Sequence, residues 1–201
     1  MAAGLAAEAV AVSRVVAAVS VAAARRVAGN VGTMPYQRSH RLLRHVVTDH
    51  TSVKRAFPST VLASIERAIA AGERAHRGQL CFAVEGALPP MRVLRKLTPR
   101  ERALEVFGLL RVWDTEENAG VLIYLLLADR DVEIVADRGI DRVVDSAAWQ
   151  AICTKMEKAF ADARYGEGVV AGIEAISRLL AEHFPRSAGD TNEIPDKLIE
   201  L

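Results

Sequence analysis

Two groups of polar residues could share chemistry in this chain, although they stand apart in its sequence. The first lies in the acidic turn that begins at Asp114 and ends at Asn118, and the second in the loop that begins with Asp137 and Arg138. Ca²⁺ and Mg²⁺ prefer carboxylate and amide oxygens as ligands, and a guanidinium binds phosphate through two parallel hydrogen bonds. The first interpretation is therefore a divalent-cation site with Asp114, Asn118 and Asp137 as ligands. Arg138 is the candidate phosphate contact.

The same residues have a plainer interpretation. Asp and Asn are common in turns because their side chains hydrogen-bond the neighbouring backbone. The spacing from Asp114 to Asn118 matches no metal-binding loop motif. The second interpretation is therefore that these are solvated turn residues, and we favour it at this stage.

No complete catalytic set accompanies these residues. His40, His45 and His50 recur every five residues, so they do not share one face of a helix. Cys81 and Cys153 fall in apolar patterns and are interpreted as buried thiols in a reducing compartment. No glycine-rich phosphate loop follows a strand. We assign no catalytic residue and no organic cofactor.

Three predicted strands and several helices must position the candidate site. Residues 80–88 alternate as a strand, residues 121–127 are continuously apolar, and residues 132–136 follow after a short charged turn. A right-handed crossover makes the first two strands parallel, and the short turn makes the last two antiparallel. This topology brings the start of the second strand beside the end of the third, and so joins the two polar groups.

The predicted fold class is α/β: an α/β/α sandwich with a mixed sheet, a β-α-β-β-α-α core and helices on both faces. Thr98, Pro99 and Glu101 predict a helix start with a capping box. Ser59 is the expected cap of one further helix, and Asp145 or Ser146 that of another. Residues 91–97 are expected to form a basic loop. The predicted core positions are Leu122, Ile123, Leu125, Trp149 and Ile173.

Composition divides the chain of 201 residues into four parts. Residues 1–33 are an Ala/Val-rich leader, 34–58 a basic amphipathic segment, 59–185 the folded domain, and 186–201 a polar tail. The leader's longest uncharged run, 15–24, is about half the length of a membrane span, so we expect no transmembrane segment. We interpret the leader as disordered, as a frayed helix or as an over-extended gene start. The expected location is cytoplasmic, or exported if the leader acts as a signal.

The basic segment is the main candidate contact surface. It holds five basic residues and one acid, whereas the whole chain has a net charge of only +1, which implies no general attraction to nucleic acid. Residues 38–55 could contact anionic lipid or an acidic protein partner. The preferred role for its face that carries Leu42 and Val46 is packing onto the domain.

The order of these elements resembles the TPM-domain family. The resemblance covers roughly residues 59–185 and rests on residues that are weak individually but specific in order: Gly78-Gln79-Leu80, the segment 118–126, the loop Asp137-Arg138-Gly139-Ile140, Trp149, Phe160 and the segment 165–185. The family often has Glu where this chain has Gln79, which removes one charge from the candidate site.

The resemblance implies an α/β/α sandwich, binding of Ca²⁺ or Mg²⁺ in some members, and acid phosphatase activity in a plant member. Many members are secreted or membrane-anchored, which implies a possible protein partner at the cell envelope. We therefore expect a non-enzymatic domain that binds a protein or responds to a cation. The alternative is a divalent-metal-dependent acid phosphatase.

Overall fold

A computed structural model of the chain describes residues 35–187, 194 and 198–201. The predicted leader and part of the predicted tail lie outside these residues. In chain order the elements are α2 (Pro35–Val47), α3 (His50–Ala56), α4 (Ser59–Glu73), β1 (Gln79–Glu85), α5 (Pro90–Leu94), α6 (Pro99–Leu109), β2 (Gly120–Leu126), β3 (Asp131–Ala136), α7 (Arg138–Asp141), α8 (Ser146–Ala161), α9 (Tyr165–His183) and β4 (Ile199–Glu200).

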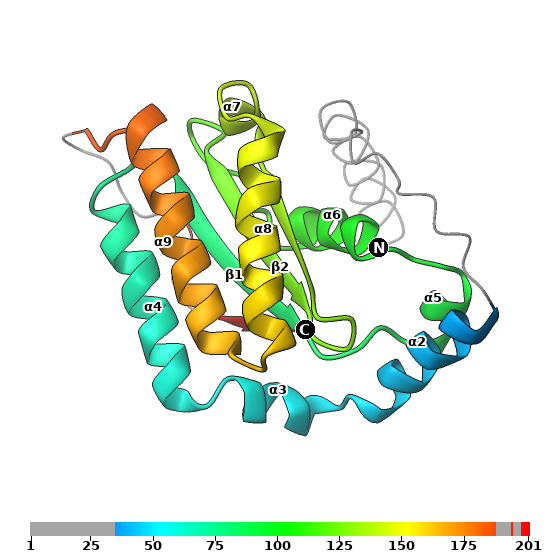
Figure 1. The fold of residues 1–201 in the computed structure, drawn as a ribbon. Coiled ribbons are helices and arrows are strands. Elements are labelled where there is room, and N and C mark those ends of the chain that lie inside the picture. Colours follow the sequence, from blue (N-terminus) through cyan, green and yellow to red (C-terminus); the bar gives the residue numbers. More distant parts are fainter. Residues whose placement is uncertain (1–34, 188–193, 195–197) are drawn as a thin grey trace, which may run out of the picture.

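A four-stranded mixed sheet in the order β3-β2-β1-β4 forms the centre of the fold (Figure 1). β1 and β2 are parallel, with Gln79 opposite Gly120. β2 and β3 are antiparallel, with Val121 opposite Ala136. The predicted α/β class, the parallel crossover and the antiparallel hairpin are all confirmed.

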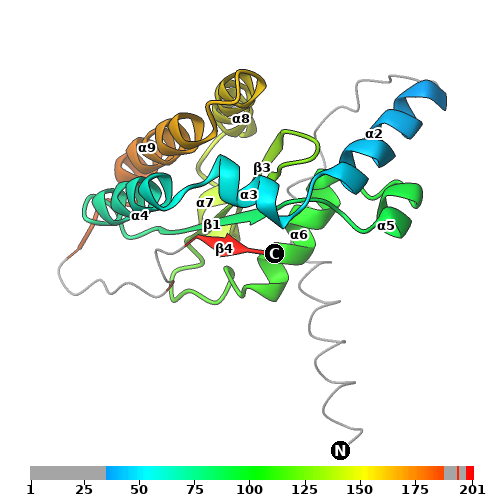
Figure 2. The same ribbon diagram turned by 90° about the horizontal axis from the view of Figure 1, so that it is seen from below.

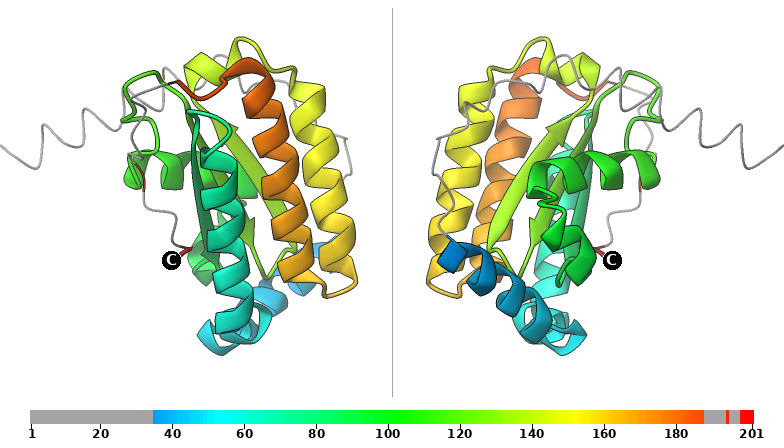
Figure 3. Two further views of the ribbon diagram at one scale, coloured as in Figure 1. Left: turned by 90° about the vertical axis from the view of Figure 1, so that its left-hand side faces the viewer. Right: turned by 90° about the vertical axis from the view of Figure 1, so that its right-hand side faces the viewer.

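Helices cover both faces of this sheet. Figure 3 shows α4, α8 and α9 against one face and α6 against the other. Val121, Ile123 and Leu125 of β2 belong to the core on the first face. Leu122, Tyr124 and Leu126 belong to the core on the α6 face. This division explains why β2 is apolar at nearly every position: a central strand must fill both cores.

The predicted core positions are confirmed, since each is at most 8% exposed. The capping box at the start of α6 is also confirmed, because Thr98 and Glu101 bond each other's backbone N–H groups. Asp145 caps α8 through the N–H of Ala147. The expected cap at Ser59 is wrong: Pro58 occupies the cap position without a side-chain hydrogen bond, and Ser59 is already helical.

Two segments depart from their predicted form. The expected basic loop at residues 91–97 begins as helix α5, because Pro90 supplies the fixed φ that suits a first helical turn. The predicted polar tail contains a short strand, β4, which pairs in parallel with β1 from Ala83 to Val84. Two apolar residues near the end of the chain, Leu198 and Ile199, pack against the cores.

The basic amphipathic segment forms α2 and α3, which lead around one end of the sheet (Figure 2). α2 packs beside α5. Leu42 contacts the core on the α6 face, as expected, but Val46 is 62% exposed, so its expected packing onto the domain is wrong. None of the helices in the described part of the chain is long and apolar enough to cross a membrane.

Candidate functional site

The predicted polar end of the sheet is formed by the loops before β2 and after β3. The N–H of Gly139 donates to the carbonyl of Asn118 at 3.0 Å, and the N–H of Asp137 donates to the carbonyl of Gly120 at 2.8 Å. A Cβ on Gly139 would lie 2.7 Å from the carbonyl oxygens of Asn118 and Glu117. The close approach of the two loops therefore requires glycine at position 139. The two backbone hydrogen bonds hold the loops together.

Asn118 and Arg138 interact directly at this end. The Arg138 guanidinium donates a hydrogen bond of 2.9 Å to the side-chain oxygen of Asn118. Asn118 has a φ of 55°, a left-handed conformation that asparagine tolerates better than most residues. In this backbone conformation, the side-chain amide of Asn118 faces the loop after β3.

Asp137 is buried beside them with half of its carboxylate unsatisfied. Its Oδ1 accepts the backbone N–H of Arg138 at 2.7 Å, whereas its buried Oδ2 has no hydrogen-bond partner. Burial raises the pKa of the Asp137 carboxyl, although the Arg138 N–H and the Arg138 charge oppose the rise. Asp137 is therefore a buried carboxylate with one oxygen that lacks a hydrogen bond.

Asp114 and Gln79 play different parts at this end. Asp114 is exposed, and its carboxylate has no hydrogen-bond or ion-pair partner among the residues that the structure describes. The side-chain oxygen of Gln79 accepts the N–H of Ile194 at 3.2 Å. The Gln79 amide thus contacts the backbone at Ile194.

Two features of this end of the sheet bear on the expected divalent-cation site. Across residues 35–187, 194 and 198–201, no three His, Cys, Asp or Glu side chains are grouped so that they could hold a metal ion. Arg138 also places a positive charge on the Asn118 oxygen that a cation would need. Ca²⁺ takes six to eight oxygen ligands, and the unpartnered Oδ2 of Asp137 is one candidate among them.

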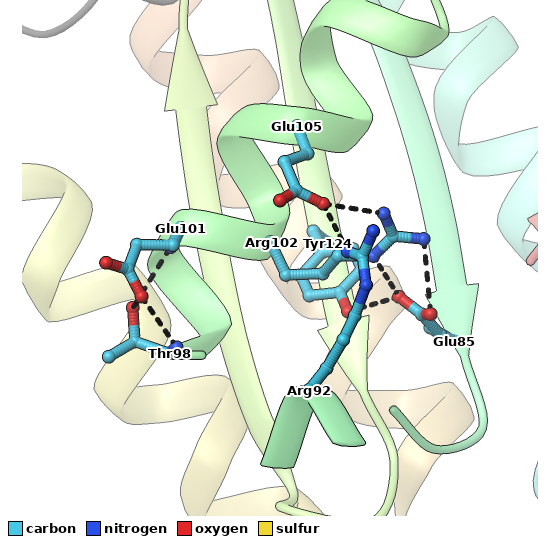
Figure 4. Close-up of polar contacts among 7 residues, drawn as sticks. All are labelled: Glu85, Arg92, Thr98, Glu101, Arg102, Glu105 and Tyr124. Atoms are coloured by element: carbon cyan, nitrogen blue, oxygen red, sulfur yellow. Dashed lines mark hydrogen bonds and ion pairs between the residues drawn. The ribbon is translucent and has the colours of Figure 1, made fainter. Parts of the chain in front are cut away.

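A second polar network, which the sequence did not predict, lies under α6 (Figure 4). Arg102 forms a two-pronged ion pair with Glu85, with distances of 2.7 Å from Nε and 3.2 Å from Nη2. The Tyr124 hydroxyl donates to Glu85 at 2.7 Å. Glu105 then bridges Arg102 and Arg92, at 2.9 Å and 2.5 Å.

Burial and charge pairing shift the pKa values of two members of this network. Burial raises the pKa of Tyr124, and the negative charge of Glu85 raises it further. Burial lowers the pKa of Arg102, but hydrogen bonds to Glu85 and Glu105 outweigh that and raise it. Tyr124 and Arg102 therefore keep their protons, which makes them poor candidates for acid–base catalysis at neutral pH.

A third cluster joins α2 to the tip of the β2–β3 hairpin. The buried Asp129 carboxylate accepts Arg41 Nε at 2.9 Å and Arg44 Nη2 at 3.2 Å. His45 is also buried, with Nε2 3.3 Å from Asp129 and Nδ1 accepting the Leu88 N–H at 2.9 Å. Burial opposes ionisation of Asp129, but His45 and Arg41 hold its pKa below the ordinary value.

The sequence contained some indication of the clusters around Glu85 and Asp129. Glu85 ends an alternating strand and Tyr124 interrupts an apolar one, and the parallel register places Glu85 opposite Leu126, two residues beyond Tyr124. The positions of Arg102 and Arg41 depend on how α6 and α2 pack, which no local pattern reveals.

The fold and these clusters define a three-layer α/β domain with one polar loop site and two ionic clusters. The family model of the TPM domain matches residues 47–179. Because this match covers well over half of the chain, the protein belongs to the TPM-domain family. The resemblance inferred from the sequence is confirmed.

A solved structure supports the same assignment. The NMR structure of the BA42 protein from the psychrophilic bacterium Bizionia argentinensis is similar, with a TM-score of 0.65 and 26% sequence identity. The similarity covers 72% of this chain and 95% of that chain. No curated protein matches. The matched residues begin at the end of α2, so almost all of α2 lies outside the family match.

Proposed function

We propose that this protein is a non-enzymatic interaction domain that binds an acidic protein partner through an apolar ridge on α2 and α5. The observation that carries the proposal is a set of large apolar side chains, each between 58% and 65% exposed, on two helices that pack together. The apolar ridge consists of Leu43, Val46, Val47, Met91 and Leu94. Exposed apolar clusters of this kind mark interaction sites on soluble domains.

The inner side of α2 is held to the domain, which keeps its outer side fixed. Arg41 bonds both Asp129 and the carbonyl of Leu97, the latter at 3.0 Å. His45 contacts Asp129 and Leu88, and Leu42 packs into the core. Because Arg41, Leu42 and His45 point inwards, the apolar ridge is presented in one orientation.

Charge favours an acidic partner. Neither α2 nor α5 contains an acidic residue. Arg44, Arg95 and Lys96 are exposed on or next to these helices. An apolar contact with a basic rim fits a partner segment that carries apolar side chains flanked by Asp or Glu, since complementary charge speeds and orients association.

A photo-crosslinker placed at Val46 tests this proposal, with the same group at the exposed Lys155 of α8 as the matched control. A partner that crosslinks to the group at position 46 but not to the group at position 155 is purified. Its affinity is then measured for wild type, Leu43→Asp/Val46→Asp and Lys155→Asp. We expect a loss of at least tenfold for the double variant and none for the control.

The double variant also distinguishes an acidic protein partner from other molecules that could bind the apolar ridge. Unchanged partner affinity in Leu43→Asp/Val46→Asp contradicts the proposal. Concentration-dependent dimerisation in sedimentation, abolished by the same variant, would assign the apolar ridge to a second copy of the chain. Cosedimentation with anionic vesicles, abolished likewise, would assign it to a lipid surface.

A second candidate function is a divalent-metal-dependent acid phosphatase. One observation favours it: the unpartnered Oδ2 of buried Asp137, beside Arg138, is an oxygen suited to a hard cation. The contact between Arg138 and Asn118 opposes it. Calorimetry with Ca²⁺ and Mg²⁺ on wild type and Asp137→Asn decides between them. Binding heat that disappears in the variant, together with hydrolysis of a phosphate ester, would favour the enzyme.

A further inference from the structure

We propose that a pocket beside the β2–β3 turn binds a small organic molecule that carries two or more anionic groups. The pocket has a volume of about 610 Å³, within the range of roughly 300–1,000 Å³ that is usual for small-molecule sites. Its walls come from α2 and α3, from the β2–β3 turn and from the α8–α9 turn. We call it the arginine pocket.

Three arginines give the arginine pocket its charge. Arg44, Arg55 and Arg130 line it, and no Asp or Glu does. Arg55 and Arg130 have no hydrogen-bond or ion-pair partner for their side chains within the described part of the chain, so both guanidinium forks are available. A guanidinium fork matches the oxygens of a phosphate or a carboxylate.

Arg44 retains donors for a ligand even though it contacts Asp129. One nitrogen, Nη2, reaches Oδ1 of that carboxylate at 3.2 Å, and the side chain is 53% exposed. Arg41 already compensates the charge of Asp129. Asp129 therefore does not cancel the positive charge of the arginine pocket.

Arg130 has an unfavourable backbone conformation in the β2–β3 turn. Its φ is 54°, in the left-handed region. A residue other than glycine adopts this conformation only at an energetic cost. Hydrogen bonds from the N–H groups of Asp129 and Arg130 to Leu126 and Leu127 hold it in place. Glycine would form the same turn without strain but would bring no charge.

The remaining walls suit the organic part of a ligand. Thr48 and Tyr165 bring hydroxyl-bearing side chains, and Leu127 and Ala128 supply apolar surface. The Tyr165 ring is fixed by stacking on Phe160 at 5.5 Å. The expected ligand therefore has a compact body that bears phosphate or carboxylate groups. Such groups occur on soluble metabolites and on the headgroups of anionic lipids.

Calorimetry with pyrophosphate and with citrate tests the soluble source, and flotation with phosphatidylglycerol vesicles against phosphatidylcholine vesicles tests the lipid source. The proteins are wild type, Arg55→Gln/Arg130→Gln, and Arg178→Gln as control. Arg178 is an exposed arginine of α9 without a partner in the described residues, about 20 Å along that helix from Tyr165 at 1.5 Å per residue.

We expect at least a tenfold weaker affinity in the double variant and unchanged affinity in Arg178→Gln. Loss of pyrophosphate or citrate binding supports a soluble ligand, and loss confined to phosphatidylglycerol vesicles supports a headgroup. Equal weakening in the control, unchanged affinity in the double variant, or no binding of any probe overturns the proposal. Melting temperatures of the three proteins should agree, since neither substituted arginine in the pocket supports the fold.

Discussion

Arg102 and Glu85 form a two-pronged ion pair beneath α6, and the Tyr124 hydroxyl completes the coordination of the carboxylate. Both charged side chains are largely buried, at 14% and 7% exposure. This pair links α6 to the end of β1 and thereby fixes the helix on its face of the sheet.

Replacing Arg102 with Met should destabilise the protein by about 3–5 kcal/mol, because it leaves the buried Glu85 charge without a partner. Urea denaturation at pH 7 measures the loss. Arg92→Gln is the control: its pair with Glu105 is exposed, and exposed pairs contribute about 0–1 kcal/mol. Equal losses in the two variants would show that burial of Glu85 does not determine the effect.

Leu125→Ala should cost about 2–5 kcal/mol, the usual range for truncating a buried leucine. Leu125 is fully buried in the central strand, whereas the control Leu109 is 63% exposed. Thermal and urea denaturation should therefore detect almost no change for Leu109→Ala. A loss below about 0.5 kcal/mol for Leu125→Ala, the size of a surface effect, would contradict the central position of β2.

Stability should fall as the pH drops from about 6.5 towards 4, in part because of His76. Burial, together with the nearby Arg186 charge, lowers the pKa of His76 to about 4. The unfolded chain therefore binds a proton in this range that the folded state does not, which costs up to about 3 kcal/mol. His76→Gln should flatten the dependence of the unfolding free energy on pH. An unchanged dependence between pH 6.5 and 4 in that variant would contradict this assignment.

Arg41→Ala should loosen α2 while leaving the sheet intact. Arg41 joins Asp129 and Leu97 to the helix, and we expect limited proteolysis between α2 and α3 to accelerate several-fold at pH 7. The lowered pKa of Asp129 means that this ionic contribution is present above pH 4 and is lost as the pH falls below it. In wild type, acceleration that begins near neutral pH would contradict this assignment.

Asp137→Asn should raise the free energy of unfolding at pH 7. The pKa of Asp137 is raised by burial, so the folded state favours the protonated carboxyl and loses stability as the pH rises through that pKa. Asparagine retains an oxygen for the Arg138 N–H and carries no charge. Urea denaturation should show a larger gain at pH 7 than at pH 4. An equal or reversed effect would mean that Asp137 is stabilised by its charge.

The sequence predicted the sheet because the information was local. The alternation before Pro89 and the apolar run in β2 specify strands, and the short turn at Asp129 specifies a hairpin. The approach of Asn118 to Arg138 also followed, since the register alone brings the two loops together.

The ionic clusters could not be predicted because they depend on helix packing. Arg41 reaches Asp129 across 88 residues of sequence. Arg102 reaches Glu85 only because of the way α6 packs against β2 and β3. The strand β4 was missed for a related reason: a pair of apolar residues in a polar segment gives too short a pattern to indicate a strand.

The pairing of β4 with β1 has a consequence for synthesis of the protein. Ala83 and Val84 acquire their outer neighbours, Ile199 and Glu200, only when the far end of the domain has emerged. Until then that edge of β1 presents unpaired backbone groups, which can template strand addition by another chain. A nascent chain that has not yet exposed Ile199 and Glu200 would therefore leave this edge of β1 open to pairing with another chain.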